Sequence, residues 1–153
     1  MAARARWWYY SKQAGERKDD MADISAGLIW DLLRHASSWL TNLGRASKER
    51  KEQSIRALRE VITASRETAV YLRCMKETGK RKPKTEARLA VLWTELGFAL
   101  EDIGIGKLAK RCQITGKHWA EPDRYDDDFL QKADVSLDRM EKLANEILAQ
   151  INR

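Results

Sequence analysis

The fold is decided by residues 47–78, which read SKERKEQSIRALREVITASRETAVYLRCMKET. Apolar or small residues recur along this stretch at alternating steps of three and four, at Ile55, Leu58, Ile62, Ser65, Ala69 and Leu72. This period is typical of an α-helix with one buried face. About 31 helical residues would form a rod roughly 46 Å long. Ser47 can cap such a helix and Gly79 can end it, so we expect one long helix along which the others pack.

Three further stretches carry stripes of the same period and predict an all-α fold. The first begins at Asp20 and ends at Gly44. The second comes after residues 47–78; it follows Thr85 and ends before Gly104, with a stripe formed by Leu89, Leu92, Leu96, Ala99 and Ile103. The last follows three aspartates at 126–128, with a stripe formed by Phe129, Ala133, Leu137, Met140, Ala144, Ile147 and Ile151. Four such helices with short connections predict an antiparallel up-down-up-down four-helix bundle.

The helix that follows Thr85 is shorter than the helix at 47–78, so another segment must cover the rest of the long helix. We expect a short extra helix within residues 105–125, between the third and fourth long helices. Its inner face would be formed by Ile105, Leu108, Ala109 and Cys112. Trp119 would then close that end of the core.

Composition places the chain among soluble globular proteins. Its 153 residues correspond to one typical domain, and 43% are hydrophobic and 34% charged. No apolar run approaches the roughly 20 residues that span a bilayer, and the N-terminus lacks the apolar core of a secretory signal. We therefore expect a cytoplasmic protein. Cys74 and Cys112 have no metal or redox spacing and would lie too far apart for a disulfide, so we expect two free thiols.

Residues 1–18 form a basic and aromatic arm ahead of a helical-bundle domain at 19–153. The arm contains four successive aromatic residues, Trp7, Trp8, Tyr9 and Tyr10. They would point all round a helix, and exposed they would form an adhesive patch. They can pack across the bundle, or they can form a protein interface, since Trp, Tyr and Arg anchor interfaces. Stacking on nucleic acid and insertion at a membrane surface are further alternatives.

The net charge of +6 is unevenly distributed. Residues 45–88 carry 14 Lys and Arg against 6 Glu, a net +8, whereas residues 119–153 carry 5 against 9, a net −4. A basic half of this kind can attract nucleic acid or an acidic protein, or it can pack beside the acidic last helix. The most basic run contains Lys80, Arg81, Lys82, Lys84 and Arg88. These side chains are candidates for phosphate contacts, and a solvated, mobile turn is the alternative.

Most enzymatic and metal sites are excluded by what the chain lacks. The only two histidines, His35 and His118, are not preceded by the Glu of a di-iron Glu-x-x-His motif. Cysteine and histidine are too few for a zinc site, and no phosphate-binding loop or Gly-x-Ser-x-Gly motif is present. Asp123 and the aspartates at 126–128 lack the pattern of a calcium loop, so we interpret them as helix-capping charge. We expect no cofactor, no metal and no small-molecule substrate.

One stretch offers a catalytic alternative. Arg111 and His118 are separated by six residues, which resembles the Arg-x(4–6)-His signature of HEPN ribonucleases. The resemblance implies a small helical bundle, often dimeric, in which the histidine moves the proton of a 2′-hydroxyl and the arginine stabilises the phosphorane. The family carries this motif near the start of a helix. Here Thr115-Gly116 predicts a turn between the two residues.

Three classes of function follow, in order of preference. The first is a non-catalytic helical interaction module, such as an adaptor, a regulatory subunit or a self-associating protein. The second is a nucleic-acid-binding accessory protein that uses the basic half at 45–88. The third is a HEPN-like ribonuclease or toxin that uses Arg111 and His118.

Overall fold

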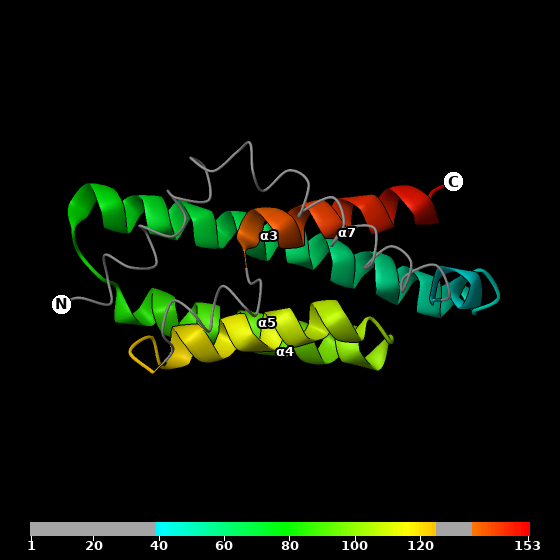
Figure 1. Ribbon diagram of the computed structural model, residues 1–153, viewed down its shortest axis with the longest axis horizontal. Coiled ribbons are helices and arrows are strands. Elements are labelled where there is room, and N and C mark those ends of the chain that lie inside the picture. The colour runs from blue at the N-terminus through cyan, green and yellow to red at the C-terminus, as the bar shows by residue number, and fades with distance from the viewer. Residues whose placement is uncertain (1–38, 125–135) are drawn as a thin grey trace, which may run out of the picture.

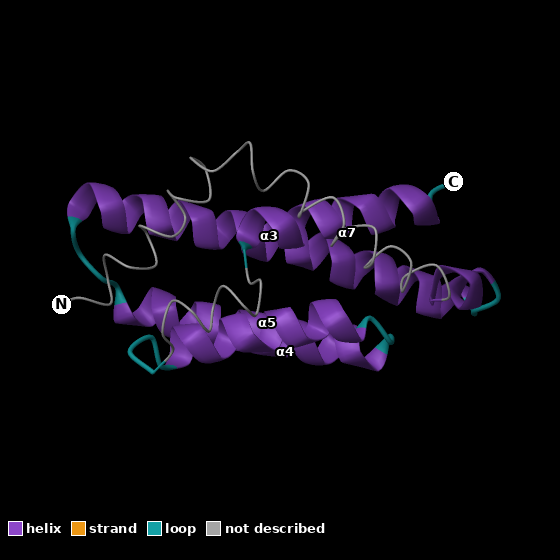
Figure 2. Ribbon diagram, viewed as in Figure 1, coloured by secondary structure: helices purple, strands orange, loops and turns teal. Residues whose placement is uncertain are grey.

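The computed structural model describes residues 39–124 and 136–153, and all regular structure there is helical, with no strand (Figures 1 and 2). Residues 39–44 are helical and are followed by α3 (Lys48–Thr78), α4 (Pro83–Asp102), α5 (Gly106–Ala120) and α7 (Leu137–Ile151). The all-α prediction is thus confirmed for these residues. The predicted arm at 1–18, most of the predicted first helix and residues 125–135 lie outside the described part. No described helix is long and apolar enough to cross a membrane.

Helix α3 begins and ends at the residues that the sequence predicts. The Oγ of Ser47 accepts a hydrogen bond from the Arg50 N–H at 3.3 Å, which caps the first turn. At the other end Gly79 adopts φ 65°, a left-handed conformation that favours glycine, and its N–H donates to the Met75 carbonyl at 2.8 Å. Between these caps the helix runs for 31 residues.

The face that α3 buries differs from the predicted one. Ile55 and Ile62 are only half-buried, and Ala69 is exposed. Among the predicted positions Leu58, Ser65 and Leu72 are correct, but the buried face is completed by Ser54, Ala57, Val61, Ala64, Thr68 and Tyr71. The predicted face was therefore displaced around the helix.

Two of the missed positions, Ser54 and Thr68, carry hydroxyl groups. The Ser54 Oγ donates to the Arg50 carbonyl at 2.8 Å, and the Thr68 Oγ1 donates to the Ala64 carbonyl at 2.7 Å. A hydroxyl whose donor is satisfied within its own helix can be buried at little cost. Ser54 and Thr68 therefore belong to the core face together with the apolar residues Ala57, Val61, Ala64 and Tyr71.

Helix α4 begins two residues before the predicted cap at Thr85, because Pro83 occupies its first turn, where a missing N–H does no harm. It ends as predicted before Gly104, which has φ 88°. The extra helix expected between 105 and 125 is present as α5, and Leu108, Ala109, Cys112 and Trp119 are buried as predicted. The turn predicted at Thr115-Gly116 is wrong, since both residues lie inside α5.

Gly116 is required for a close helix contact rather than for a turn. A Cβ at Gly116 would lie 2.3 Å from the Thr94 Oγ1 and 2.9 Å from the Thr94 N of α4. A Cβ at Gly97 would likewise lie 2.5 Å from the Gln113 Cγ of α5. The two glycines therefore allow the backbones of α4 and α5 to approach closely.

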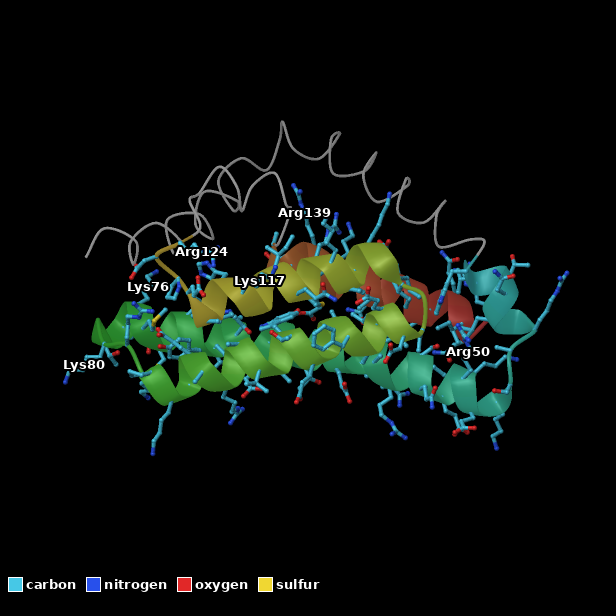
Figure 3. The ribbon with its side chains drawn as sticks, turned by 90° about the horizontal axis from the view of Figure 1, so that it is seen from below. Arg50, Lys76, Lys80, Lys117, Arg124 and Arg139 are labelled. Carbon is cyan, nitrogen blue, oxygen red and sulfur yellow. The ribbon has the colours of Figure 1, made fainter. Side chains whose placement is uncertain are left out.

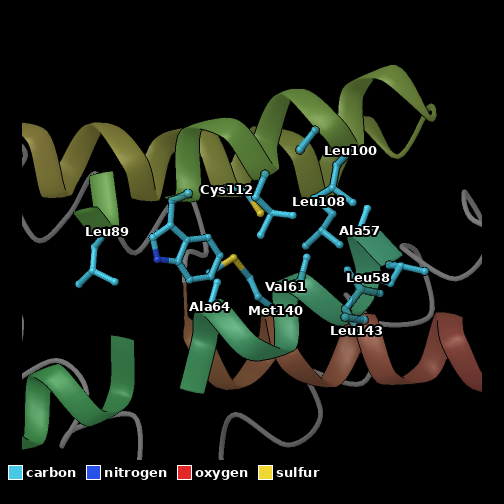
Figure 4. Close-up of a cluster of buried hydrophobic side chains, with 14 of the residues drawn as sticks. Ala57, Leu58, Val61, Ala64, Leu89, Leu100, Leu108, Cys112, Met140 and Leu143 are labelled. Carbon is cyan, nitrogen blue, oxygen red and sulfur yellow. The ribbon is translucent and has the colours of Figure 1, made fainter. Parts of the chain in front are cut away.

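The described helices form two layers, α3 with α7 and α4 with α5, and α3 also contacts α4 (Figure 1). Successive helices run in opposite directions, as their colours from cyan to red show (Figure 1). The core between the layers is apolar, and members from all four helices are drawn in Figure 4, among them Leu58, Leu89, Leu108, Cys112 and Met140. Trp93 is fully buried there and donates from Nε1 to the Thr68 Oγ1 at 2.9 Å. Both cysteines are free thiols, as predicted.

Candidate functional site

The best-defined polar site in the described residues lies where α3 turns into α4. We call residues 79–84 the basic turn. Its backbone is held at several points: the Lys80 N–H donates to the Thr78 Oγ1 at 3.3 Å, and the Lys82 N–H donates to the Tyr71 Oη at 2.9 Å. The Lys82 carbonyl accepts from the N–H groups of residues 85 and 86 at 2.9 and 3.1 Å. These hydrogen bonds hold the backbone of the basic turn and disfavour the alternative of a solvated, mobile turn.

Behind the basic turn lies a cluster of five side chains that we call the end cluster: Tyr71, Arg81, Glu86, His118 and Trp119. Arg81 binds Glu86 through two parallel hydrogen bonds, from Nε to Oε1 and from Nη2 to Oε2, each 2.7 Å long. The Tyr71 Oη donates to the Glu86 Oε1 at 2.9 Å. The Trp119 ring packs edge-on against the rings of Tyr71 and His118, with centroids 5.7 and 5.5 Å apart. The cluster joins α3, the basic turn, α4 and α5.

Burial and charge set the protonation of this cluster. Burial raises the pKa of the Tyr71 hydroxyl, and the hydrogen bond to Glu86 raises the pKa of Arg81. Burial lowers the pKa of His118 to about 4, with a further decrease from the positive charge of Arg81 and an opposing effect of Glu86. The imidazole is therefore neutral near pH 7, while Arg81 and Glu86 form a charge-assisted pair.

The five basic residues singled out in the sequence divide into two groups. Arg81 points inward to Glu86, so only 25% of its side chain is exposed, and Arg88 forms an ion pair with Glu67 on α3. The three lysines of the basic turn, Lys80, Lys82 and Lys84, are exposed. Lys80 projects from the end of the molecule at the turn (Figure 3). None of the three forms an ion pair within residues 39–124 and 136–153, and the Lys82 Nζ lies 3.9 Å from the Cys74 Sγ.

Arg111 and His118 do not converge on an open site. Both lie on α5, seven residues or about 10.5 Å apart along its axis. Arg111 is half-buried, whereas His118 is 5% exposed and packs against Trp119. A buried imidazole with a pKa of about 4 is poorly suited to move protons near neutral pH.

Three other findings concern the rest of the described residues. An open hollow of about 490 Å³ runs along α7 and is lined by Asp138, Glu141, Lys142, Asn145, Glu146 and Ala149. No group of three or more potential metal ligands occurs in the part of the chain that the structure describes. The large apolar side chains exposed there are Val70 on α3 and Val91 and Phe98 on α4, each more than half accessible.

Sequence reasoning missed Tyr71 and Glu86, the residues that organise the end cluster. Glu86 follows Arg81 by five residues, but an acidic residue in the first turn of a helix is ordinarily interpreted as a favourable interaction with the helix dipole. Tyr71 belongs to the buried face of α3 that the sequence misplaced. The predicted interface residues Trp7, Trp8, Tyr9 and Tyr10 lie outside the described residues, as does His35.

Comparison with descriptions of known protein families, with curated proteins and with solved structures finds no match. The function must therefore be argued from the residues of this chain.

Proposed function

We propose that the chain is a non-catalytic helical-bundle interaction module, and that its basic turn binds the phosphate backbone of nucleic acid. The observation that carries this proposal is the division of the basic residues. Arg81 is held by Glu86, while Lys80, Lys82 and Lys84 are left exposed on a backbone that Tyr71 and Glu86 hold in place.

The chemistry of the exposed groups favours phosphate over a protein partner. Lysine is depleted in protein interfaces, where arginine and aromatic residues provide the anchors. Ammonium groups bind phosphates as point charges and release condensed counterions on binding, which supplies affinity without sequence readout. Because Arg81, the one arginine of the basic turn, is engaged with Glu86, the contact would be blind to base sequence.

A non-catalytic role is supported by the position of His118. The HEPN-like alternative requires a histidine that can exchange protons with an RNA hydroxyl, and this side chain is 5% exposed. In the proposed module the first helix at 20–44 packs antiparallel to α3 beside the described helices, and the arm at 1–18 covers the bundle or contributes to partner contacts. These two assignments rest on the apolar periodicity and on the aromatic composition of those segments.

The experiment is a titration of a fluorescein-labelled 20-bp DNA duplex of mixed sequence with the full chain at several salt concentrations. For a monomer bound through one basic turn, three phosphate contacts correspond to a slope of about −2.7 in log K against log salt, or roughly a 40-fold loss of affinity between 50 and 200 mM salt. The triple variant Lys80→Gln, Lys82→Gln, Lys84→Gln should reduce that slope by about 2.7. A second duplex of unrelated sequence should bind equally well.

A matched control removes three exposed lysines at the opposite end of the helices, Lys48→Gln, Lys107→Gln and Lys110→Gln. This control has the same net charge as the triple variant and should retain the wild-type slope. Tyr71→Phe changes no charge but removes the Oη that holds the Lys82 N–H, and should weaken binding several-fold with an unchanged slope. Equal losses in the two triple variants, or no binding at 50 mM salt, would refute a contact localised at the basic turn.

A further inference from the structure

The outer face of α4 carries a regular stripe of exposed side chains. Its members are spaced alternately by four and three residues: Lys84, Arg88, Val91, Glu95, Phe98 and Asp102. This spacing places them on one side of the helix, opposite the face that buries Leu89, Trp93 and Leu100 in the core. Val91 and Phe98 are 56% and 55% exposed. A helix that is apolar on its inner face ordinarily has only polar residues at these outer positions.

The charges of the stripe are segregated along the helix. Lys84 and Arg88 lie toward its start, and Glu95 and Asp102 lie toward its end, with the two large apolar residues between or beside them. Arg88 forms an ion pair with Glu67, but 69% of its side chain remains exposed and can make a second contact. When the stripe is paired with an identical stripe that runs in the opposite direction, its positive end therefore faces the negative end of the other.

We infer that this stripe is a self-association surface, and that its occupant is the same stripe of a second copy of this chain in antiparallel orientation. Full overlap of the stripe with its reverse places the two-fold axis near residue 93. Lys84 then lies opposite Asp102 of the second copy, and Arg88 opposite its Phe98, which allows a cation–π contact. Val91 packs against the aliphatic part of Glu95 of the second copy. A two-fold pairing uses the same patch on both copies, as an isologous interface requires.

The parallel orientation is disfavoured by the same residues. It would place Lys84 against Lys84, Arg88 against Arg88 and Glu95 against Glu95 of the second copy. Like charges directly opposite one another are repulsive, so charge alone selects the antiparallel pairing. The contact of a single helix face is small compared with a stable dimer interface, so the dissociation constant should lie in the micromolar range.

This inference concerns the outer face of α4, which shares Lys84 with the basic turn, and it is tested without nucleic acid. The average mass of the full chain is measured by sedimentation velocity between 1 and 200 μM at low salt. We expect the wild-type mass to rise from that of the monomer toward that of the dimer. Phe98→Asp should weaken the dimer at least tenfold, whereas Val70→Asp, which changes an equally exposed valine on α3, should leave it unchanged.

A charge exchange tests the orientation. Lys84→Glu and Asp102→Lys should each weaken the dimer severalfold, because each places like charges across the interface. The double variant should recover the wild-type dissociation constant to within about threefold. Both changes place charges that favour the helix dipole at the ends of α4, so the variants should fold. A wild-type chain that remains monomeric at 200 μM would overturn the inference, and so would a double variant no stronger than its weaker parent.

Discussion

Replacement of Gly116 by alanine should destabilise the protein, although alanine is the better helix former. A Cβ at this position would lie 2.3 Å from the Thr94 Oγ1, 2.9 Å from the Thr94 N and 3.1 Å from the Ala90 carbonyl. The hydroxyl cannot rotate away freely, because it donates to the Ala90 carbonyl at 2.7 Å. The other two atoms belong to the α4 backbone, so α4 and α5 must move apart.

The expected size of this effect follows from two opposing contributions. Overpacking against backbone costs up to about 3 kcal/mol. The gain from replacing glycine inside a helix is about 1 kcal/mol. The free energy of unfolding should therefore fall by about 2 kcal/mol, which corresponds to a decrease of roughly 4–8 °C in Tm for a chain of this size.

The assay is urea unfolding followed by circular dichroism, with the Tm measured separately. Gly106→Ala is the matched control, because Gly106 lies at the start of the same helix, has no positive φ, and a Cβ there would contact nothing within 4 Å. This control should be neutral or stabilising by up to about 1 kcal/mol. If Gly116→Ala is as stable as Gly106→Ala, the close approach of α4 and α5 is wrong.

Three further outcomes test the buried polar groups. The pKa of His118 is about 4 in the folded chain and near 6.5 when unfolded, so the unfolded state binds more protons between these pH values. The free energy of unfolding should therefore fall as the pH decreases from 6.5 to 4. In urea unfolding, His118→Gln should reduce that fall by up to about 3 kcal/mol. A thiol reagent should modify Cys74 in the native protein and Cys112 only after unfolding, since burial raises the pKa of Cys112 to about 12; in Cys74→Ser no native thiol should react. Thr68→Val leaves the buried Trp93 Nε1 without its acceptor and should cost about 1–3 kcal/mol in the same unfolding assay.

The sequence was sufficient to predict where helices begin and end when the signal is local. Ser47 and Gly79 act through hydrogen bonds to residues three or four positions away, so their effect depends on neighbours in the chain. The long helix between them was therefore predicted to the residue. The face that this helix buries was less well predicted. Ser54 and Thr68 satisfy their hydroxyls within the helix and behave as core residues, and four missed positions, Ala57, Val61, Ala64 and Tyr71, are apolar or aromatic.

Features that depend on a second helix could not be predicted from a single stretch. Gly116 is typical of a turn when only its neighbours are considered, and its actual role depends on Thr94 in another helix. The orientation of Arg81 could not be predicted for the same reason. Its side chain is drawn away from the basic surface by the Glu86 carboxylate, which Tyr71 of α3 also contacts. The charge count of residues 45–88 therefore overstated the charge available to a partner.

The two proposed surfaces have a geometric relation that can be tested. Residue 82 lies 11 residues, or about 16.5 Å, from the proposed two-fold axis near residue 93, so the two basic turns of a dimer would be about 33 Å apart along α4. One turn of B-DNA measures about 34–36 Å. A dimer could therefore contact one duplex through Lys80 and Lys82 of both turns, and the second contact would be intramolecular.

Phe98 lies outside the basic turn. On this geometry, Phe98→Asp should nevertheless weaken binding to a 20-bp duplex about tenfold or more, because it prevents bivalent contact. An 8-bp duplex is only about 27 Å long and cannot reach both basic turns, so the same variant should bind it as the wild type does. Fluorescence anisotropy at protein concentrations above the dimer dissociation constant measures both affinities. Equal losses on the two duplexes would mean that Phe98 acts on the fold or on the DNA contact directly, because only the longer duplex depends on the distance between two turns.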